Sequence, residues 1–171
     1  MYVYIHPYYY FCISVIFIHL YTRTIVIILL LYLFIGIIVT LVASQFVDLH
    51  IQNYAVVFFV IILTATMFAT AGLVNAVFAK SFDDISIVPT FILTPLTYLG
   101  GIFYSIKMLP EFWQNVSMAN PVLYMVNAFR YGFLGFSDIA IENAIVLIVV
   151  FIVGLFSLAY YLLSKGIGIR A

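Results

Sequence analysis

Long apolar runs separated by short polar turns dominate the chain. Residues 25–47 and 54–79 contain no charged side chain, and residues 141–163 contain a single acid near their start. Each run is long enough for a helix that crosses the hydrocarbon core of a bilayer, which takes about 20 residues. Together with one interrupted run, they predict an all-α integral membrane protein with about four transmembrane helices.

The interrupted run, residues 85–104, contains Pro89, Pro95 and a double glycine. A proline removes a backbone donor and clashes with the preceding helical turn. Irregular backbone is tolerated at membrane depth only where protein or a water-filled cavity surrounds it. We therefore predict a broken third span, and we expect the segment around it to be the functional part of the protein.

One face of this third span carries hydroxyl groups and a glycine. Thr90, Thr94, Thr97 and Gly101 are spaced so that they share one side of a helix. Their hydroxyls would either satisfy carbonyls freed by the prolines or line a polar path. Gly100 and Gly101 permit a sharp turn or the close approach of another helix.

Two short amphipathic segments follow, at residues 110–118 and 121–134. Trp113 suits the boundary between membrane and water. Asn120 and Pro121 predict a helix start, with Asn at the N-cap and Pro at the first helical position. The second helix would be about 20 Å long at 1.5 Å per residue, too short to span. Both are predicted to be external helices, interfacial or re-entrant.

Polar side chains gather on one side of the second short helix. Tyr124, Asn127 and Arg130 fall there, together with Tyr131. Arg130 would either bind an anionic substrate or lipid head group, or snorkel to water or pair internally. The pattern alone leaves these alternatives open.

The composition agrees with a membrane protein and narrows the chemistry. Apolar residues make up 67% of the 171 residues and charged residues 7%, against about 25% charged in soluble domains. The charges sum to zero, which argues against a nucleic-acid partner. A single cysteine, Cys12, and dispersed histidines predict no metal site, and no phosphate-binding glycine loop is present. We expect no cofactor and no catalytic residues, and a membrane-embedded enzyme would need an acid–base or metal constellation that the sequence lacks.

The amino-terminal stretch and the positive charges bear on topology. Residues 1–24 are rich in tyrosine and of unclear status: an interfacial piece, a truncated span or sequence foreign to the rest. With four spans, one side of the membrane receives Arg23, Lys80, Lys165 and Arg170. The positive-inside rule places that side, and with it the carboxyl terminus, in the cytoplasm. Residues 104–139 would then be external.

Three stretches carry a family resemblance. They are AGLVNAVFA at 71–79, SFDDISIVPTFILTPLTYLGGIFYS at 81–105 and NPVLYMVNAFRYGFLG at 120–135. Together with the order of spans, they resemble the carboxyl-terminal part of ABC-2 type transporter permeases, especially the bacterial inner-membrane subgroup of YadH and nodulation protein J. The resemblance covers about residues 35–170.

The resemblance implies six spans per permease, a pore made with a second permease copy, and a separate ATP-binding subunit that drives export across the inner membrane. This chain has room for the last four family spans only. We therefore expect a truncated permease subunit. The first spans of the family and its coupling helix are not recognisable in residues 1–34. The alternatives are a non-transporting membrane interaction or assembly protein, or an inactive gene remnant.

Overall fold

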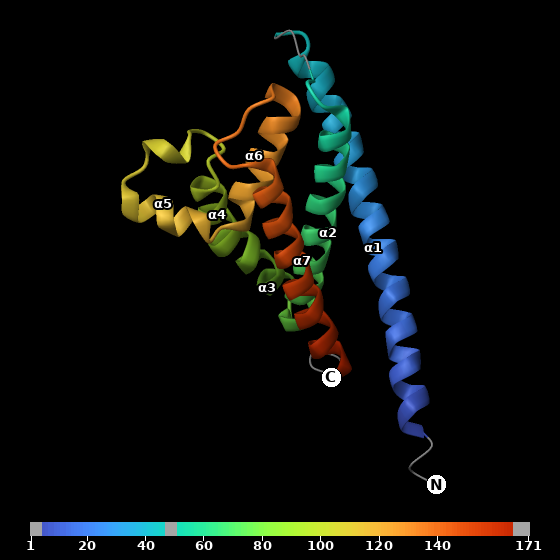
Figure 1. Cartoon of the computed structure of the whole chain (residues 1–171). Coiled ribbons are helices and arrows are strands. Elements are labelled where there is room, and N and C mark those ends of the chain that lie inside the picture. Colours follow the sequence, from blue (N-terminus) through green and yellow to red (C-terminus); the bar gives the residue numbers. More distant parts are fainter. Residues whose placement is uncertain (1–4, 47–50, 166–171) are drawn as a thin grey trace.

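Every regular element in the described part of the chain is helical. The computed structural model describes residues 5–46 and 51–165, and three long helices form its frame: α1 (Ile5–Ala43), α2 (Tyr54–Phe78) and α7 (Ile141–Ser164) (Figure 1). Within that part, Arg23–Ala43 of α1, all of α2 and all of α7 are long and apolar enough to cross a membrane. The prediction of an all-α membrane protein is confirmed.

Helix α1 begins much earlier than the predicted span of residues 25–47. It contains 39 residues, about 58 Å at 1.5 Å per residue. The tyrosine-rich stretch from Ile5 onward is therefore part of this helix and not a separate segment, because its one proline, Pro7, lies in the first turn, where a missing N–H costs nothing. Residues 1–4 and Val47 lie outside the described residues.

The same helix also ends earlier than predicted, at Ala43. The Ser44 hydroxyl donates to the Leu41 carbonyl, and Gln45 and Phe46 form hydrogen bonds that reach back only three residues. Such local bonds compete with the helical ladder and close the helix. Toward its carboxyl end α1 packs on α2, and toward its amino end it diverges from the other helices (Figure 1).

The best-packed part of the molecule lies among α2, α6 (Pro121–Leu134) and α7. Its buried core consists of Val60, Met67, Tyr124, Met125, Ala128, Ala144 and Ile148. A Cβ atom on Gly132 would lie 2.7 Å from Val57 Cγ2 of α2, so only glycine allows α6 to come this close. Between apolar helices in lipid, such close packing replaces the hydrophobic effect as the source of association.

The turn between α1 and α2 is fastened to the carboxyl end of α6. The backbone N–H groups of Gln52 and Asn53 donate to the carbonyls of Phe133 and Gly132, at 3.3 and 2.9 Å. These carbonyls belong to the last turn of α6, where the helix itself supplies no donors. The turn and the end of α6 therefore lie on the same side of the molecule.

The predicted third span is a run of three six-residue segments: α3 (Phe82–Ile87), the π-helix η1 (Val88–Leu93) and α4 (Thr94–Leu99). The backbone N–H of Thr94 reaches back five residues to the Pro89 carbonyl. Pro89 also leaves the Ile85 carbonyl without its usual donor, and Asn75 Nδ2 of α2 donates to that oxygen at 2.9 Å. A side chain from the neighbouring helix α2 thus supplies the hydrogen bond that the proline removes.

This run was predicted to continue to residue 104, but it ends at Leu99. Gly101 takes φ +71°, a left-handed conformation that glycine adopts without strain and that ends a helix. At the other end, Ser81 and Asp84 form a capping box. Hydrogen bonds from the Lys80 backbone and from Ser81 hold the pKa of Asp84 below its ordinary value, so this half-buried acid is charged at neutral pH and acts as a helix cap.

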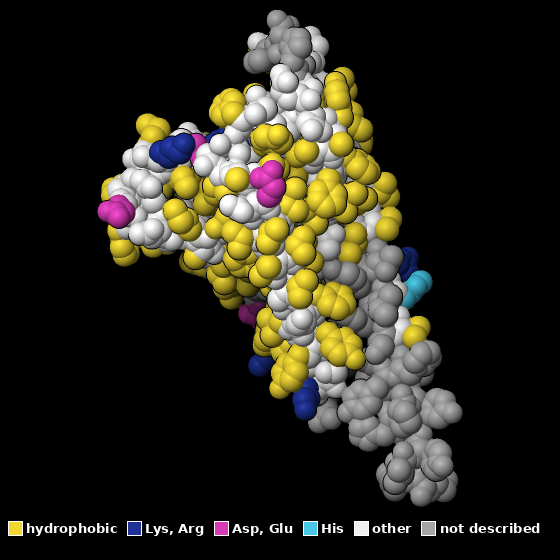
Figure 2. All heavy atoms as spheres, viewed as in Figure 1, with side chains coloured by type: hydrophobic (Ala, Val, Ile, Leu, Met, Phe, Trp, Pro, Cys, Tyr) yellow, Lys and Arg dark blue, Asp and Glu magenta, His cyan; other side chains and the backbone are white. Residues whose placement is uncertain are grey.

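Apolar side chains are spread over the described part of the face shown in Figure 2, and charged side chains are few there. On α7, Val146, Val150 and Val153 form one outward stripe, each about 60% exposed. The short elements between α4 and α6, namely η2 (Ile106–Met108) and α5 (Glu111–Met118), extend to one side (Figure 1). A surface of this kind is expected where lipid is the surrounding solvent.

Candidate functional site

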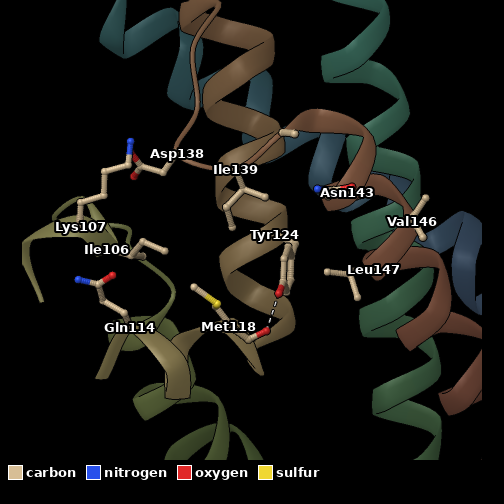
Figure 3. Close-up of a pocket in the computed structure, with 11 residues that line it drawn as sticks. Ile106, Lys107, Gln114, Met118, Tyr124, Asp138, Ile139, Asn143, Val146 and Leu147 are labelled. Carbon is tan, nitrogen blue, oxygen red and sulfur yellow. Dashed lines mark hydrogen bonds and ion pairs between the residues drawn. The ribbon is translucent and has the colours of Figure 1, made fainter. Parts of the chain in front are cut away.

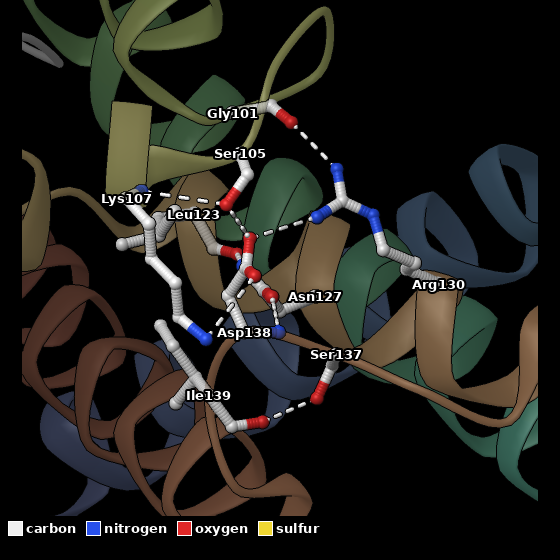
Figure 4. A network of polar contacts seen from close by, with 9 residues as sticks. All are labelled: Gly101, Ser105, Lys107, Leu123, Asn127, Arg130, Ser137, Asp138 and Ile139. Carbon is white, nitrogen blue, oxygen red and sulfur yellow. Dashed lines mark hydrogen bonds and ion pairs between the residues drawn. The ribbon is translucent and has the colours of Figure 1, made fainter. Parts of the chain in front are cut away.

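A network of polar side chains joins the end of the broken run, α6 and the loop that leads to α7 (Figure 4). Arg130 of α6 is its centre. Its Nη1 donates to Oδ2 of Asp138 at 3.1 Å, and its Nη2 donates to the Gly101 carbonyl at 2.8 Å. The side chains of Arg130 and Asp138 are only 19% and 15% exposed. One guanidinium therefore connects two segments that are far apart in the sequence.

The Asp138 carboxylate collects further donors. The Ser105 hydroxyl donates to Oδ2 at 2.8 Å, and Lys107 Nζ lies 3.9 Å from Oδ1 with its side chain 73% exposed. Figure 4 shows Arg130 and Lys107 approaching this carboxylate from two sides. Two cations thus share one carboxylate, which leaves the cluster with one uncompensated positive charge.

Asn127 positions Asp138 through the backbone. Its Oδ1 accepts the Asp138 N–H at 2.8 Å, while its Nδ2 donates to the Leu123 carbonyl one turn earlier. Asn127 is 1% exposed, so both ends of its amide have a hydrogen-bond partner in a dry environment. Asn127 and Arg130 were predicted to share one side of the helix, and both reach Asp138. Tyr124 was grouped with them, but its hydroxyl donates to the Met118 carbonyl.

Asn120 connects the broken run to α6. Its Oδ1 accepts the Val122 N–H at 2.9 Å, and Pro121 occupies the first turn, so the predicted helix start is confirmed. Its Nδ2 donates to the Leu96 carbonyl at 2.6 Å. That carbonyl lacks a helical donor because Gly100 N–H bonds to Thr97 instead. The buried amide of Asn120 therefore caps the start of α6 and also supplies a donor to a carbonyl in the last turn of α4.

The remaining residues singled out from the sequence lie away from this network. Pro89, Thr90, Thr94 and Pro95 are exposed, and Thr97 is half-buried. The hydroxyls of Thr94 and Thr97 donate to carbonyls of the preceding turn, which is the structural role that the sequence allowed for them. Trp113 is 46% exposed and packs edge-on against Phe112.

A cavity of about 490 Å³ lies next to the network (Figure 3). It opens between η2 and α5 on one side and the start of α7 on the other. Its lining combines apolar and polar side chains: Ile106, Lys107, Gln114, Met118, Tyr124, Asp138, Ile139, Ala140, Asn143, Val146 and Leu147. Within the described residues, no three metal-ligating side chains are grouped together.

Sequence reasoning did not single out Asp138, Ser105 or Lys107 as site residues. A signal was available for Asp138, because Gly135 ends α6 in a left-handed conformation. A chain that reverses there returns its next acid toward the last turns of the helix, where Arg130 lies. No comparable local signal marks Ser105, whose contact with Asp138 spans 33 residues.

Comparison with known proteins adds an independent finding. The family model described as ABC-2 type transporter matches residues 3–134. The match therefore begins well before residue 35, where the resemblance seen in the sequence starts. No solved structure matches the chain.

Several curated relatives are similar. The inner membrane transport permease YadH of Escherichia coli K12 is 50% identical over 137 residues, which cover 80% of this chain and 54% of the relative. Nodulation protein J of Rhizobium leguminosarum bv. trifolii is 27% identical over 106 residues, 62% of this chain and 40% of the relative. The chain thus spans about half the length of the E. coli relative that it matches. With its apolar helices and this family match over most of its length, the chain is a membrane protein and belongs to the ABC-2 type transporter family.

Proposed function

We propose that this chain is a permease subunit of an ABC-type exporter in the inner membrane. The observation that carries the proposal is the 50% identity to a transport permease over 80% of this chain. In the proposed complex, a separate ATP-binding subunit hydrolyses ATP, and a second permease copy completes the pore. The permease itself performs no bond chemistry. Its contribution is to open and close a path through the membrane.

In this proposal the Arg130 network closes the external end of the path. The network connects the carbonyl of Gly101, at the end of the broken run, to Asp138, just before α7. A movement that separates α4 from α6 must break the bond from Arg130 to the Gly101 carbonyl and the bond from Asn120 to the Leu96 carbonyl. Helices α4 and α6 therefore move together unless these hydrogen bonds are lost.

The function is tested with a complete permease that contains this chain. The parts of the E. coli permease that the chain does not match are joined to it, and the chimera is co-expressed with the cognate ATP-binding subunit. We expect the two proteins to co-purify in detergent and the permease to raise the rate of ATP hydrolysis. A chimera that inserts into the membrane but neither binds the subunit nor changes its activity would instead support an assembly or interaction protein.

Orientation is a separate prediction. We propose that residues 104–139 face the outside and that the carboxyl terminus is cytoplasmic, as the distribution of lysine and arginine suggests. In a Cys12→Ser background, Met108→Cys should react with an impermeant thiol reagent in intact cells, since this side chain is 79% exposed. Lys80→Cys, also at an exposed position, should react only after permeabilisation. The opposite pattern would reverse the topology.

A further inference from the structure

The cavity beside the Arg130 network has two kinds of wall. Apolar side chains from η2, α5 and α7 form one part, including Met118, Val146 and Leu147. Lys107 and Asn143 approach it from opposite sides, one from η2 and the other from α7 (Figure 3). A concave site with mostly apolar walls and a few converging polar groups is typical of small-molecule binding, and 490 Å³ lies within the usual size range of about 300–1,000 Å³.

The charged cluster at one end of this cavity, formed by Arg130, Lys107 and Asp138, carries a net charge of +1. Asp138 already accepts hydrogen bonds from Arg130 at 3.1 Å and from Ser105 at 2.8 Å. Lys107 lies farther away, 3.9 Å from the other carboxylate oxygen, and remains 73% exposed. The nearby acids Glu111 and Glu142 are exposed and form no ion pair in the described part of the chain. Within the cluster, Lys107 is therefore the cation with the weaker contact to the shared carboxylate.

Two further features favour an anion near Lys107. Helix α7 has 24 residues and starts after Ala140 without a side-chain cap, so the positive end of its dipole lies at the cavity wall. Glu142 in the first turn offsets this only in part, because it is exposed and screened by solvent. The side-chain amide of Asn143 is exposed and forms no hydrogen bond within the described residues, so it can donate to a ligand.

We propose that this cavity binds an amphiphile with one negatively charged head group. The head group lies between Lys107 and Asn143, and the apolar part lies against Met118, Val146 and Leu147. A single negative charge on the head group balances the cluster, because two cations, Lys107 and Arg130, share the one carboxylate of Asp138. The head group belongs either to an anionic lipid of the bilayer or to a free amphiphile such as a fatty acid. The proposal goes beyond the export function, since binding requires neither ATP nor a partner subunit.

The chain carries its own reporter, because Trp113 is its single tryptophan and adjoins Gln114 of the cavity wall. The full chain is placed in nanodiscs of phosphatidylcholine and titrated with 10-bromodecanoate, whose bromine quenches tryptophan fluorescence at short range. We expect saturable quenching. The matched neutral probe, 10-bromodecanol, should quench only through partition into the lipid, without saturation.

Variants locate the binding site. Lys107→Gln should weaken the binding of bromodecanoate by about tenfold, the loss of one charge-assisted contact. Lys80→Gln, which removes an exposed lysine from the loop before α3, should leave it unchanged. Met118→Glu is an independent check at a side chain that is 50% exposed, because a carboxylate in the apolar wall should abolish binding without touching Lys107.

Two results would overturn the proposal: equal affinity in the Lys107→Gln variant and the wild type, or saturable binding of the neutral probe with the same affinity. Replacing part of the phosphatidylcholine by phosphatidylglycerol distinguishes the two sources of the head group. Competition by phosphatidylglycerol assigns the site to a bilayer lipid, and its absence assigns the site to a free amphiphile. Because no ATP-binding subunit takes part, failure here leaves the proposed export function untouched, and failure of export leaves this binding intact.

Discussion

Replacement of Arg130 by methionine is expected to lower the melting temperature of the purified protein by about 4–12 °C. Removal of one partner from a buried ion pair costs about 3–5 kcal/mol, and partial exposure of both side chains reduces this to about 2–3 kcal/mol. For a chain of this size, each kcal/mol corresponds to roughly 2–4 °C. The loss is large because Asp138 and the Gly101 carbonyl lose their donor together. Thermal unfolding in detergent measures it.

A double-mutant cycle shows whether the effect belongs to the pair. Arg130→Met and Asp138→Asn should each destabilise the protein, and the double variant should cost clearly less than the sum of the two. The matched control is Lys107→Met, which removes an exposed cation from the same cluster and should cost at most about 1 kcal/mol. If the double variant lost as much stability as the two single variants together, the contact between Arg130 and Asp138 would contribute nothing to stability.

The Arg130→Lys variant distinguishes an arginine that bridges Asp138 and the Gly101 carbonyl from one that only snorkels to water. A lysine that only snorkels would preserve stability, since both side chains reach the interface. Here two different nitrogens of Arg130 bind two different acceptors, and a single ammonium lacks the planar fork needed to do the same. The lysine variant should therefore lie between the wild type and Arg130→Met in melting temperature. A lysine variant as stable as the wild type would contradict the two-acceptor role.

The second large effect is expected at Gly132, where α6 crosses α2. A leucine there would force its Cβ to within 2.7 Å of Val57 Cγ2 and 3.3 Å of the Val57 backbone nitrogen. The backbone cannot yield, so α6 must move away and strain the hydrogen bond between the Asn53 N–H and the Gly132 carbonyl. Such overpacking costs about 3 kcal/mol, the upper end of the usual range, or roughly 6–12 °C in melting temperature.

Gly72 provides the matched control for this substitution. It lies within α2, and apart from its chain neighbours and the adjacent backbone of α2 no atom lies within 4 Å of a Cβ built on it. Gly72→Leu should leave stability unchanged or raise it by up to about 1 kcal/mol, because leucine favours a helix more than glycine does. The two leucine variants thus have opposite expected signs. Equal changes at Gly72 and Gly132 would show that the contact between α6 and α2 is not tight.

Helices with strong local signals were predictable from the sequence. Apolar runs of spanning length led to α2 and α7, which begin at Tyr54 and Ile141 as expected. Asn120 and Pro121 marked the start of α6 through capping chemistry, and Pro89 marked an irregular turn. These features depend on residues within one or two turns of each other, so a linear reading captures them.

The bounds of α1 and of the broken run were less predictable. Residues 5–24 combine tyrosines with an apolar stretch too short to span, and this suggested a separate segment. Because their one proline, Pro7, lies in the first turn, the helix continues from them without a break into the rest of α1. The run after Ser81 was expected to reach residue 104. Hydrophobicity continues past Leu99, but the left-handed backbone at Gly101 ends the helix first. Backbone geometry outweighs hydrophobicity at such a point.

The amino-acid sequence by itself determined that lipid surrounds this protein, where its long helices lie and where the third one breaks. Only the tertiary structure decided what compensates for the breaks. Asn75 reaches Ile85 across 10 residues, Asn120 reaches Leu96 across 24, and Arg130 reaches Gly101 across 29. Each polar side chain had several local alternatives, to snorkel, to cap or to bind a ligand. The choice among them depends on which carbonyl a neighbouring helix leaves without a donor, and that is a property of packing in three dimensions.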